Sequence, residues 1–155
     1  GMGTEYSYEC VGINSRLDSI QAAVLNVKLK YLDSYNTARL EVANYYDQAF
    51  SNCTQLSIPY RNEKSSHVFH QYTLKLEGGI NRDALVQYMN DKGIPVKAYY
   101  PKPLHSFAPY KQVTAKEDDF MVANSLCSSV ISLPIHTELS QEALKYITSS
   151  LVAFF

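Results

Sequence analysis

The feature that most constrains the fold is a run of residues, 67–76, in which apolar and polar side chains largely alternate. Because successive side chains of a strand point to opposite faces, this period of two predicts a strand with one buried face. That face would carry Val68, His70, Tyr72, Leu74 and Leu76. Residues 78–79 are both glycine and predict a turn directly after the strand. A half-buried strand needs partners and a covering layer, which the rest of the chain has to supply.

Two shorter runs, residues 96–100 and 130–133, are the candidate partner strands, and Pro134 ends the second of them. Apolar residues three or four positions apart predict helices around these strands. The first predicted helix covers residues 18–34. The second is capped by Asn36 or Thr37 and ends at about Phe50. Three further helices are predicted at residues 81–92, at 116–128 and from 141 onward. The alternation of strand and helix predicts an α/β fold, in which helices pack on a small sheet of about three strands.

The expected helices carry local signals at their first residues. Two overlapping capping boxes, Ser15 with Asp18 and Asp18 with Gln21, mark the start of the first helix. Asn81 and Ser140 precede later helices and are good N-cap residues. Inward-facing positions are expected at Leu40, Ala43, Tyr46 and Phe50 in the second helix and at Phe120, Ala123, Leu126 and Cys127 in the fourth.

Composition bounds the class of protein. The chain has 155 residues, 46% hydrophobic and 19% charged, which excludes disorder as the main state and allows a real core. We expect one domain over residues 2–155, with Gly1 before Met2 a remnant of tag removal. Lysine and arginine number 14 against 15 acidic residues, so the net charge of −1 offers no electrostatic footprint for nucleic acid or an anionic membrane.

Three features of the sequence indicate a compartment. No apolar run approaches the roughly 20 residues of a membrane span. Residues 1–12 lack the basic start and the apolar stretch of a signal peptide. Cys10, Cys53 and Cys127 are odd in number and widely spaced, which argues against a disulfide framework or a zinc site. We therefore expect a cytoplasmic protein that binds neither membrane nor nucleic acid.

The 4 histidines are the candidate chemical groups. His67 and His70 lie three apart on the predicted strand and point to opposite faces, which disfavours a shared metal ion and makes His70 a candidate core histidine. His105 and His136 follow proline-containing loops, where binding residues are common, and a capping or surface role is the alternative for His136. The sequence contains no nucleophile elbow, P-loop or dinucleotide-binding glycine motif. These residues alone therefore indicate a domain with aromatic-rich polar loops and no defined reaction.

Residues 12–23 read GINSRLDSIQAA and narrow the choice. They resemble the G-x-N-x-R-(L/M)-x-x-(I/L)-Q-A-A segment of the DegT/DnrJ/StrS family, pyridoxal-phosphate aminotransferases that act on keto sugars, mostly nucleotide-linked. Four further segments resemble family motifs in the family's order, at residues 39–46, 67–72, 93–105 and 132–140. Each match is short, and it is their common order along the chain that makes the resemblance specific.

The resemblance covers the C-terminal portion of the family, which is the smaller domain of a fold-type I aminotransferase with its connecting helix. It implies a homodimer, a keto-sugar substrate, an amino-acid donor and pyridoxal phosphate in the full-length enzyme, with a role in cell-surface polysaccharide or secondary-metabolite biosynthesis. The family's Schiff-base lysine, its pyridine-nitrogen aspartate and most of its phosphate-binding loop lie before the segment that matches residues 12–23. We therefore expect this chain to hold no catalytic or metal-binding residue, to bind no cofactor and to be inactive alone.

Three residues take expected roles from the resemblance. Asn14 would reach across the dimer to the cofactor phosphate of the partner subunit, where an amide donor satisfies a phosphate oxygen without adding charge. Arg16 would lie close to the same pocket and meet a substrate phosphate or carboxylate, and His105 would border the sugar pocket. From the residues alone, Asn14 is equally a helix cap and Arg16 a solvated first-turn residue. For the whole chain, the alternative is a stand-alone, non-catalytic module that binds a small ligand or dimerises.

Overall fold

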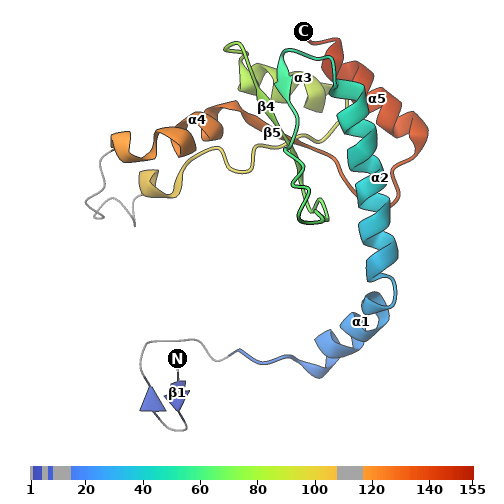
Figure 1. Cartoon of the computed structure of the whole chain (residues 1–155), viewed down its shortest axis with the longest axis vertical. Coiled ribbons are helices and arrows are strands. Elements are labelled where there is room, and N and C mark those ends of the chain that lie inside the picture. Colours follow the sequence, from blue (N-terminus) through green and yellow to red (C-terminus); the bar gives the residue numbers. More distant parts are fainter. Residues whose placement is uncertain (1, 5–6, 9–14, 108–116) are drawn as a thin grey trace. The chain divides into compact units, whose positions relative to one another are not determined.

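The computed structural model describes residues 2–4, 7–8, 15–107 and 117–155. The chain divides into two compact units, Gly1–Asp33 and Ser34–Phe155, and each is described by itself (Figure 1). The first unit contains two short antiparallel strands, β1 (Met2–Thr4) and β2 (Ser7–Tyr8), and the helix α1 (Ser19–Leu29).

Helix α1 begins with the predicted capping box. The Asp18 carboxylate accepts a hydrogen bond from the Ile20 backbone N–H at 2.8 Å, and the Gln21 side chain accepts one from the Asp18 N–H at 3.3 Å. The expected end at residue 34 is wrong, because the chain turns after Leu29, where the Tyr31 N–H bonds the Lys28 carbonyl at 3.0 Å. Apolar spacing continues across this turn, so periodicity alone does not reveal it. All residues of α1 are described, and none of them is buried.

Helix α2 (Leu32–Phe50) therefore begins earlier than predicted and ends where expected. Its buried face consists of Val42, Ala43, Tyr46 and Phe50. The expected inward position Leu40 is wrong, since that side chain is 38% exposed and Val42 takes its place. The helix thus presents its aromatic residues to the core from its last three turns.

A three-stranded antiparallel sheet has the order β3 (Leu56–Ser57), β4 (Tyr72–Leu76) and β5 (Val130–Leu133). The predicted sheet of about three strands with helices packed on it is confirmed. Residues 96–100 are not one of its strands, because they contribute only the isolated bridge between Lys97 and Ser132. The third strand is β3, which pairs with Lys75 and Leu76 at the other edge of β4, while Pro95, which has no N–H to donate, precedes the stretch that bridges β5.

The central strand β4 is shorter than the alternating run, because the backbone reverses its twist at Phe69, where φ is +48°. This left-handed conformation places the Phe69 ring in the core at 1% exposure. Val68 and His70 are consequently exposed, and the prediction that His70 is a core histidine is wrong. From Tyr72 onward, the expected alternation of buried and partly buried residues holds.

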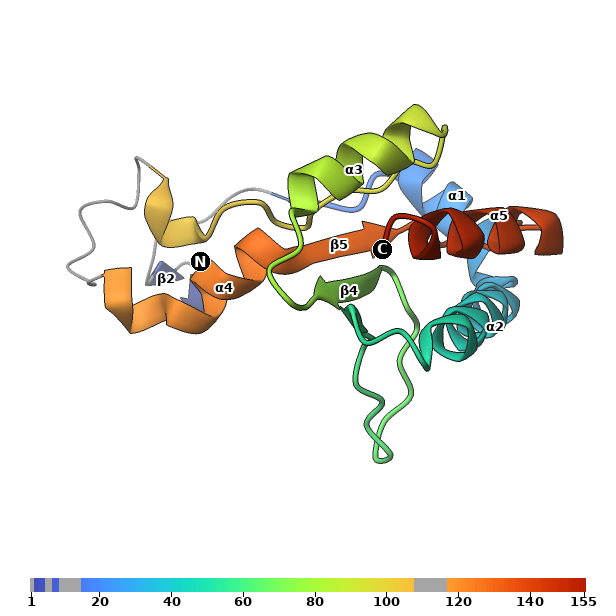
Figure 2. The same ribbon diagram turned by 90° about the horizontal axis from the view of Figure 1, so that it is seen from above.

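The remaining helices are α3 (Arg82–Asp91), α4 (Met121–Ser129) and α5 (Gln141–Val152), with 3₁₀ turns at η1 (Leu104–Ser106) and η3 (Glu117–Phe120). Asn81 and Ser140 cap α3 and α5 as predicted, through bonds of 3.0 and 3.2 Å to backbone N–H groups. Figure 1 and Figure 2 show α2 and α5 side by side. Together with α3 they enclose the core against the sheet.

Helix α4 differs from the other helices of the second unit. Of the predicted inward face, Ala123, Leu126 and Cys127 line the cavity beside β3 and β4, but no residue of α4 is buried. Phe120 and Leu126 are each 40% exposed, and Met121 and Val122 are more than 70% exposed. An amphipathic pattern reports that a face is apolar and not that this chain covers it.

The core closes around four aromatic rings, those of Tyr46, Phe50, Phe69 and Tyr72. The Tyr46 hydroxyl donates to the Pro134 carbonyl at 2.8 Å, and the Tyr72 hydroxyl donates to the Asp47 carboxylate at 2.7 Å. Burial raises the pKa of both hydroxyls well above the usual value, and the bond to Asp47 raises that of Tyr72 further. Both groups are therefore protonated hydrogen-bond donors across the physiological pH range.

Candidate functional site

His105 lies in the 3₁₀ turn η1, which Pro103 precedes in an extended conformation. The imidazole stacks on the Phe120 ring, with ring centroids 4.7 Å apart and planes inclined by 18°. The ring is half-buried, so one face is covered by an aromatic side chain and its edge remains accessible. The stack fixes the orientation of the imidazole, which is what a residue at the border of a binding pocket requires.

His105 lines a cavity of about 480 Å³ together with polar and basic side chains. These include Arg82, Lys102, Ser106 and Ser128. The Arg82 guanidinium is already engaged, because it contacts Asp83 through Nε and Nη2 and donates from Nη1 to the Cys127 carbonyl. Lys102 is exposed, and no acidic residue of the described lining offsets its charge. The cavity therefore combines one unopposed positive charge with polar side chains, which can meet an anionic group and hydroxyl groups of a ligand.

A second, more apolar cavity of about 540 Å³ lies between strands β3 and β4 and the helix α4. Tyr99, Tyr100, Ile58 and Leu126 line it, and Cys127 borders both this cavity and the one beside His105. Tyr100 is 69% exposed, so the aromatic wall stands open to solvent. The two cavities thus flank α4, one apolar and one polar.

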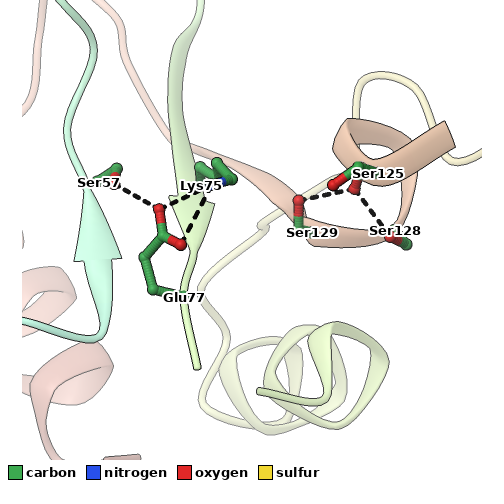
Figure 3. Close-up of polar contacts among 6 residues, drawn as sticks. All are labelled: Ser57, Lys75, Glu77, Ser125, Ser128 and Ser129. Atoms are coloured by element: carbon green, nitrogen blue, oxygen red, sulfur yellow. Dashed lines mark hydrogen bonds and ion pairs between the residues drawn. The ribbon is translucent and has the colours of Figure 1, made fainter. Parts of the chain in front are cut away.

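The polar side chains around the apolar cavity are satisfied locally. Glu77 accepts from Ser57 at 2.6 Å and from Lys75 at 2.9 and 3.1 Å, and these contacts hold the pKa of the Glu77 carboxyl below its usual value, the Ser57 bond most of all. Figure 3 shows this group on the strands, and on α4 it shows two serine hydroxyls, those of Ser128 and Ser129, turned back on the helix. The positive charge of Lys75 is therefore paired with the carboxylate of Glu77.

The first unit holds Arg16, which is exposed and lies in an extended segment two residues before the Asp18 cap. Arg16 therefore precedes the helix and is not a first-turn residue. Asn14 lies outside the described residues. Arg16 and His105 belong to different compact units, so each is described within its own unit, and the expected binding roles of Asn14, Arg16 and His105 stay predictions.

The other histidines serve local structure. His136 is exposed, and its Nδ1 accepts a hydrogen bond from the Glu138 N–H at 3.2 Å, which is the capping role left open from the sequence. His67 accepts in the same way from the Phe69 N–H at 2.8 Å. Within the part of the chain that the structure describes, no three His, Cys, Asp or Glu side chains gather closely enough to hold a metal ion.

Comparison with known proteins shows to which family the chain belongs. The model of the DegT/DnrJ/EryC1/StrS aminotransferase family matches residues 1–152. The chain belongs to this family. The resemblance predicted from the five ordered motifs is thereby confirmed. None of the helices among the described residues is both long and apolar enough to cross a membrane.

Curated members of the family match nearly the whole chain. The erythromycin biosynthesis sensory transduction protein EryC1 of Saccharopolyspora erythraea is 35% identical over 153 residues, which are 99% of this chain and 41% of that protein. The dTDP-3-amino-3,4,6-trideoxy-alpha-D-glucose transaminase of Streptomyces venezuelae is 34% identical, over 95% of this chain and 38% of that protein. The chain thus spans about two fifths of the length of the curated relatives it matches.

Solved structures of the family share the fold. A DegT DnrJ EryC1 StrS aminotransferase from Brucella abortus superposes with a TM-score of 0.83 at 36% identity, covering 98% of this chain and 39% of its own. The S. venezuelae enzyme DesV, solved in complex with a ketimine intermediate, gives a TM-score of 0.86 at 30% identity, over 99% of this chain and 41% of its own. The family fold is therefore present in this chain over its whole matched length.

Proposed function

We propose that this chain is the C-terminal portion of a cytoplasmic, pyridoxal-phosphate-dependent aminotransferase that transfers an amino group from an amino-acid donor to a nucleotide-linked keto sugar. The product would enter cell-surface polysaccharide or secondary-metabolite biosynthesis. The observation that carries the proposal is the match of one aminotransferase family over residues 1–152. Relatives named as dTDP- and UDP-sugar transaminases support the substrate class.

We expect no covalent cofactor site among the described residues. A Schiff-base lysine has to sit in a preformed pocket that lowers its pKa or activates its amine. Lys75 is paired with Glu77, and Lys97 and Lys102 line cavities but are exposed to solvent. Pyridoxal phosphate supplies an electron sink when it is bound, and we assign its lysine to the remainder of a longer protein.

The contribution of this chain is to bind and orient. Asn14 would donate to the cofactor phosphate of the partner subunit in a homodimer, and Arg16 would hold a phosphate or carboxylate of the substrate. His105, fixed by its stack on Phe120, would border the sugar through its accessible edge. The hydroxyl-lined cavity beside His105 supports this placement, because sugars are recognised by convergent hydrogen-bonding groups.

The experiment separates the fragment from a longer enzyme. The 155-residue chain is mixed with pyridoxal phosphate, reduced with borohydride and examined by mass spectrometry. We expect no stoichiometric adduct on any lysine, whereas the same chain fused to the remainder of a relative should form one. In that fusion, His105→Ala should raise KM for the keto sugar with the adduct unchanged, and His136→Ala is the matched control. A stoichiometric adduct on the chain alone, or equal KM values for the two variants, would contradict the proposal.

A further inference from the structure

Arg39 on α2 anchors two backbone segments through three carbonyls with a single nitrogen. Its Nη1 donates to the carbonyls of Phe69 at 3.3 Å, His70 at 3.4 Å and Ile135 at 3.1 Å. Nη1 lies on the far side of the guanidinium from the edge formed by Nε and Nη2. That edge is the parallel fork with which arginine meets a carboxylate.

The same edge binds a carboxylate in both other arginines of the second unit. Arg61 contacts Asp47 through Nε at 2.8 Å and Nη2 at 2.6 Å, and Arg82 contacts Asp83 through Nε at 2.9 Å and Nη2 at 2.7 Å. Among the described residues, the Nε and Nη2 of Arg39 have no such partner. Every buried side-chain nitrogen and oxygen there has a partner, so the free edge of Arg39 is accessible to solvent.

Arg39 lines a cavity of about 340 Å³, the Arg39 cavity, together with His70, Gln71, Lys97, Tyr99 and Ser132. Its described lining holds two cationic side chains, Arg39 and Lys97, and no acidic one. Lys97 is exposed, and its side chain makes no ion pair with the described residues. Its volume lies at the lower end of the range for small-molecule sites.

The residue directly before His70 and Gln71 of the Arg39 cavity is held in an unfavourable backbone conformation. Phe69 has φ +48°, and a residue in this region costs about 1–3 kcal/mol unless its surroundings fix it. The His67 ring, the Arg39 guanidinium and the Arg61 guanidinium, 4.0 Å from the Phe69 ring centroid, all do so. The result is that His70 and Gln71, which have no side-chain partner among the described residues, are presented at the cavity. Such over-determined strain accompanies binding sites more often than plain turns.

We propose that the Arg39 cavity binds a small organic acid, with its carboxylate on the Nε and Nη2 edge of Arg39. Lys97 supplies the second positive charge, so a dicarboxylate binds more tightly than a monocarboxylate. Gln71 and Tyr99 at the same cavity offer neutral donors for the rest of the ligand. The binding needs neither cofactor nor transamination, so it can be tested on the chain alone.

The test is a titration of the isotopically labelled 155-residue chain with glutarate, followed by backbone amide shifts at low ionic strength, where charges are least screened. We expect saturable shifts centred on residues 70–71, 97 and 132, with butyrate binding more weakly. Lys97→Gln should weaken glutarate about fivefold, the upper range for a solvent-accessible ion pair, without disturbing the fold. Gln71→Glu should weaken it through like-charge repulsion.

The matched control is Lys145→Gln, which removes an exposed lysine of α5 that lies outside the Arg39 cavity. It should leave glutarate affinity unchanged. The absence of saturable shifts with glutarate would overturn the proposal, as would equal affinities in the Lys97→Gln and Lys145→Gln variants. Inorganic phosphate that binds as tightly as glutarate would also overturn it, because the two separated carboxylates of glutarate would then add nothing over a compact anion on the arginine fork.

Discussion

Asp47 is the residue whose removal should most clearly expose how the small domain is held together. Its carboxylate on α2 accepts the buried Tyr72 hydroxyl at 2.7 Å and pairs with the Arg61 guanidinium at 2.6 Å. Arg61 in turn lies over the Phe69 ring, 4.0 Å from its centroid. One carboxylate therefore joins a helix, the central strand and the strained turn.

The destabilisation expected for Asp47→Ala follows from the two groups that lose their partner, the Tyr72 hydroxyl and the Arg61 guanidinium. Tyr72 loses a charged acceptor while its hydroxyl stays buried, which costs about 1.5–3 kcal/mol. The Arg61 pair is about a third exposed, with side chains 32% and 22% accessible, so its loss adds at most about 1 kcal/mol. We expect a loss of roughly 2–4 kcal/mol in the free energy of unfolding. Tyr72→Phe should cost less, about 1 kcal/mol, because it removes the buried hydroxyl itself and leaves Asp47 paired with Arg61.

The assay is urea unfolding of the chain and of a double-mutant cycle that combines Asp47→Ala with Tyr72→Phe. The two losses should not add, because both variants break the same bond. Glu63→Ala is the matched control, since it removes one exposed negative charge and should change stability by less than about 0.5 kcal/mol. If Asp47→Ala costs no more than Tyr72→Phe, or if the losses add, the network described here is refuted.

Two further predictions concern alkaline stability and association. Unfolded tyrosine ionises near pH 10.0, whereas burial raises the pKa of Tyr46 and Tyr72, so stability is complete below pH 10.0 and falls above it. Above pH 10.0 each tyrosine should lower the free energy of unfolding by about 1.4 kcal/mol per pH unit. Tyr72→Phe should roughly halve this dependence on pH, measured by urea unfolding, and an unchanged dependence would contradict the prediction. In size-exclusion light scattering the chain should dimerise through the exposed α1 residues Val24 and Val27. Glutamate at either position should dissociate the dimer while Lys28→Glu does not; a 17.5 kDa parent species contradicts this.

Local signals in the sequence predicted the starts of α1, α3 and α5. Asp18, Asn81 and Ser140 each cap the helix expected of them, because a cap depends on a side chain and a backbone N–H two or three residues away. The last helix and the strand β5 were equally accessible to pattern reading. The signals that predict these elements lie within the elements themselves and do not depend on residues elsewhere in the chain.

Long-range contacts account for what the sequence did not reveal. The turn at Phe69 shifts the buried face by one position, and it is held by Arg39, which is 30 residues away. No period within residues 67–76 carries that information. The motif that begins at Arg39 was a usable signal, since a half-buried arginine early in an apolar helix requires acceptors, but it does not say which ones.

In the candidate site, too, the sequence predicted some features, and others are visible only in the structure. His105 was picked out by its proline-rich surroundings and its family motif, and the structure supplies the Phe120 stack and the adjoining cavity. The apolar exposure of α4 could not be predicted, because an apolar face looks the same in sequence whether this chain or another one covers it. Arg16 keeps its expected role as a proposal.

The Arg39 anchor has a consequence for the order in which the chain folds. Its three carbonyl acceptors come from segments 30 and 96 residues along the chain, so the anchor can close only after the sequence beyond β5 has docked. Contacts of such separation are made late, because their loop entropy has to be overcome first. We therefore expect the left-handed turn at Phe69 to form on the native side of the folding barrier. Weakening the anchor should quicken unfolding while leaving the refolding rate nearly untouched.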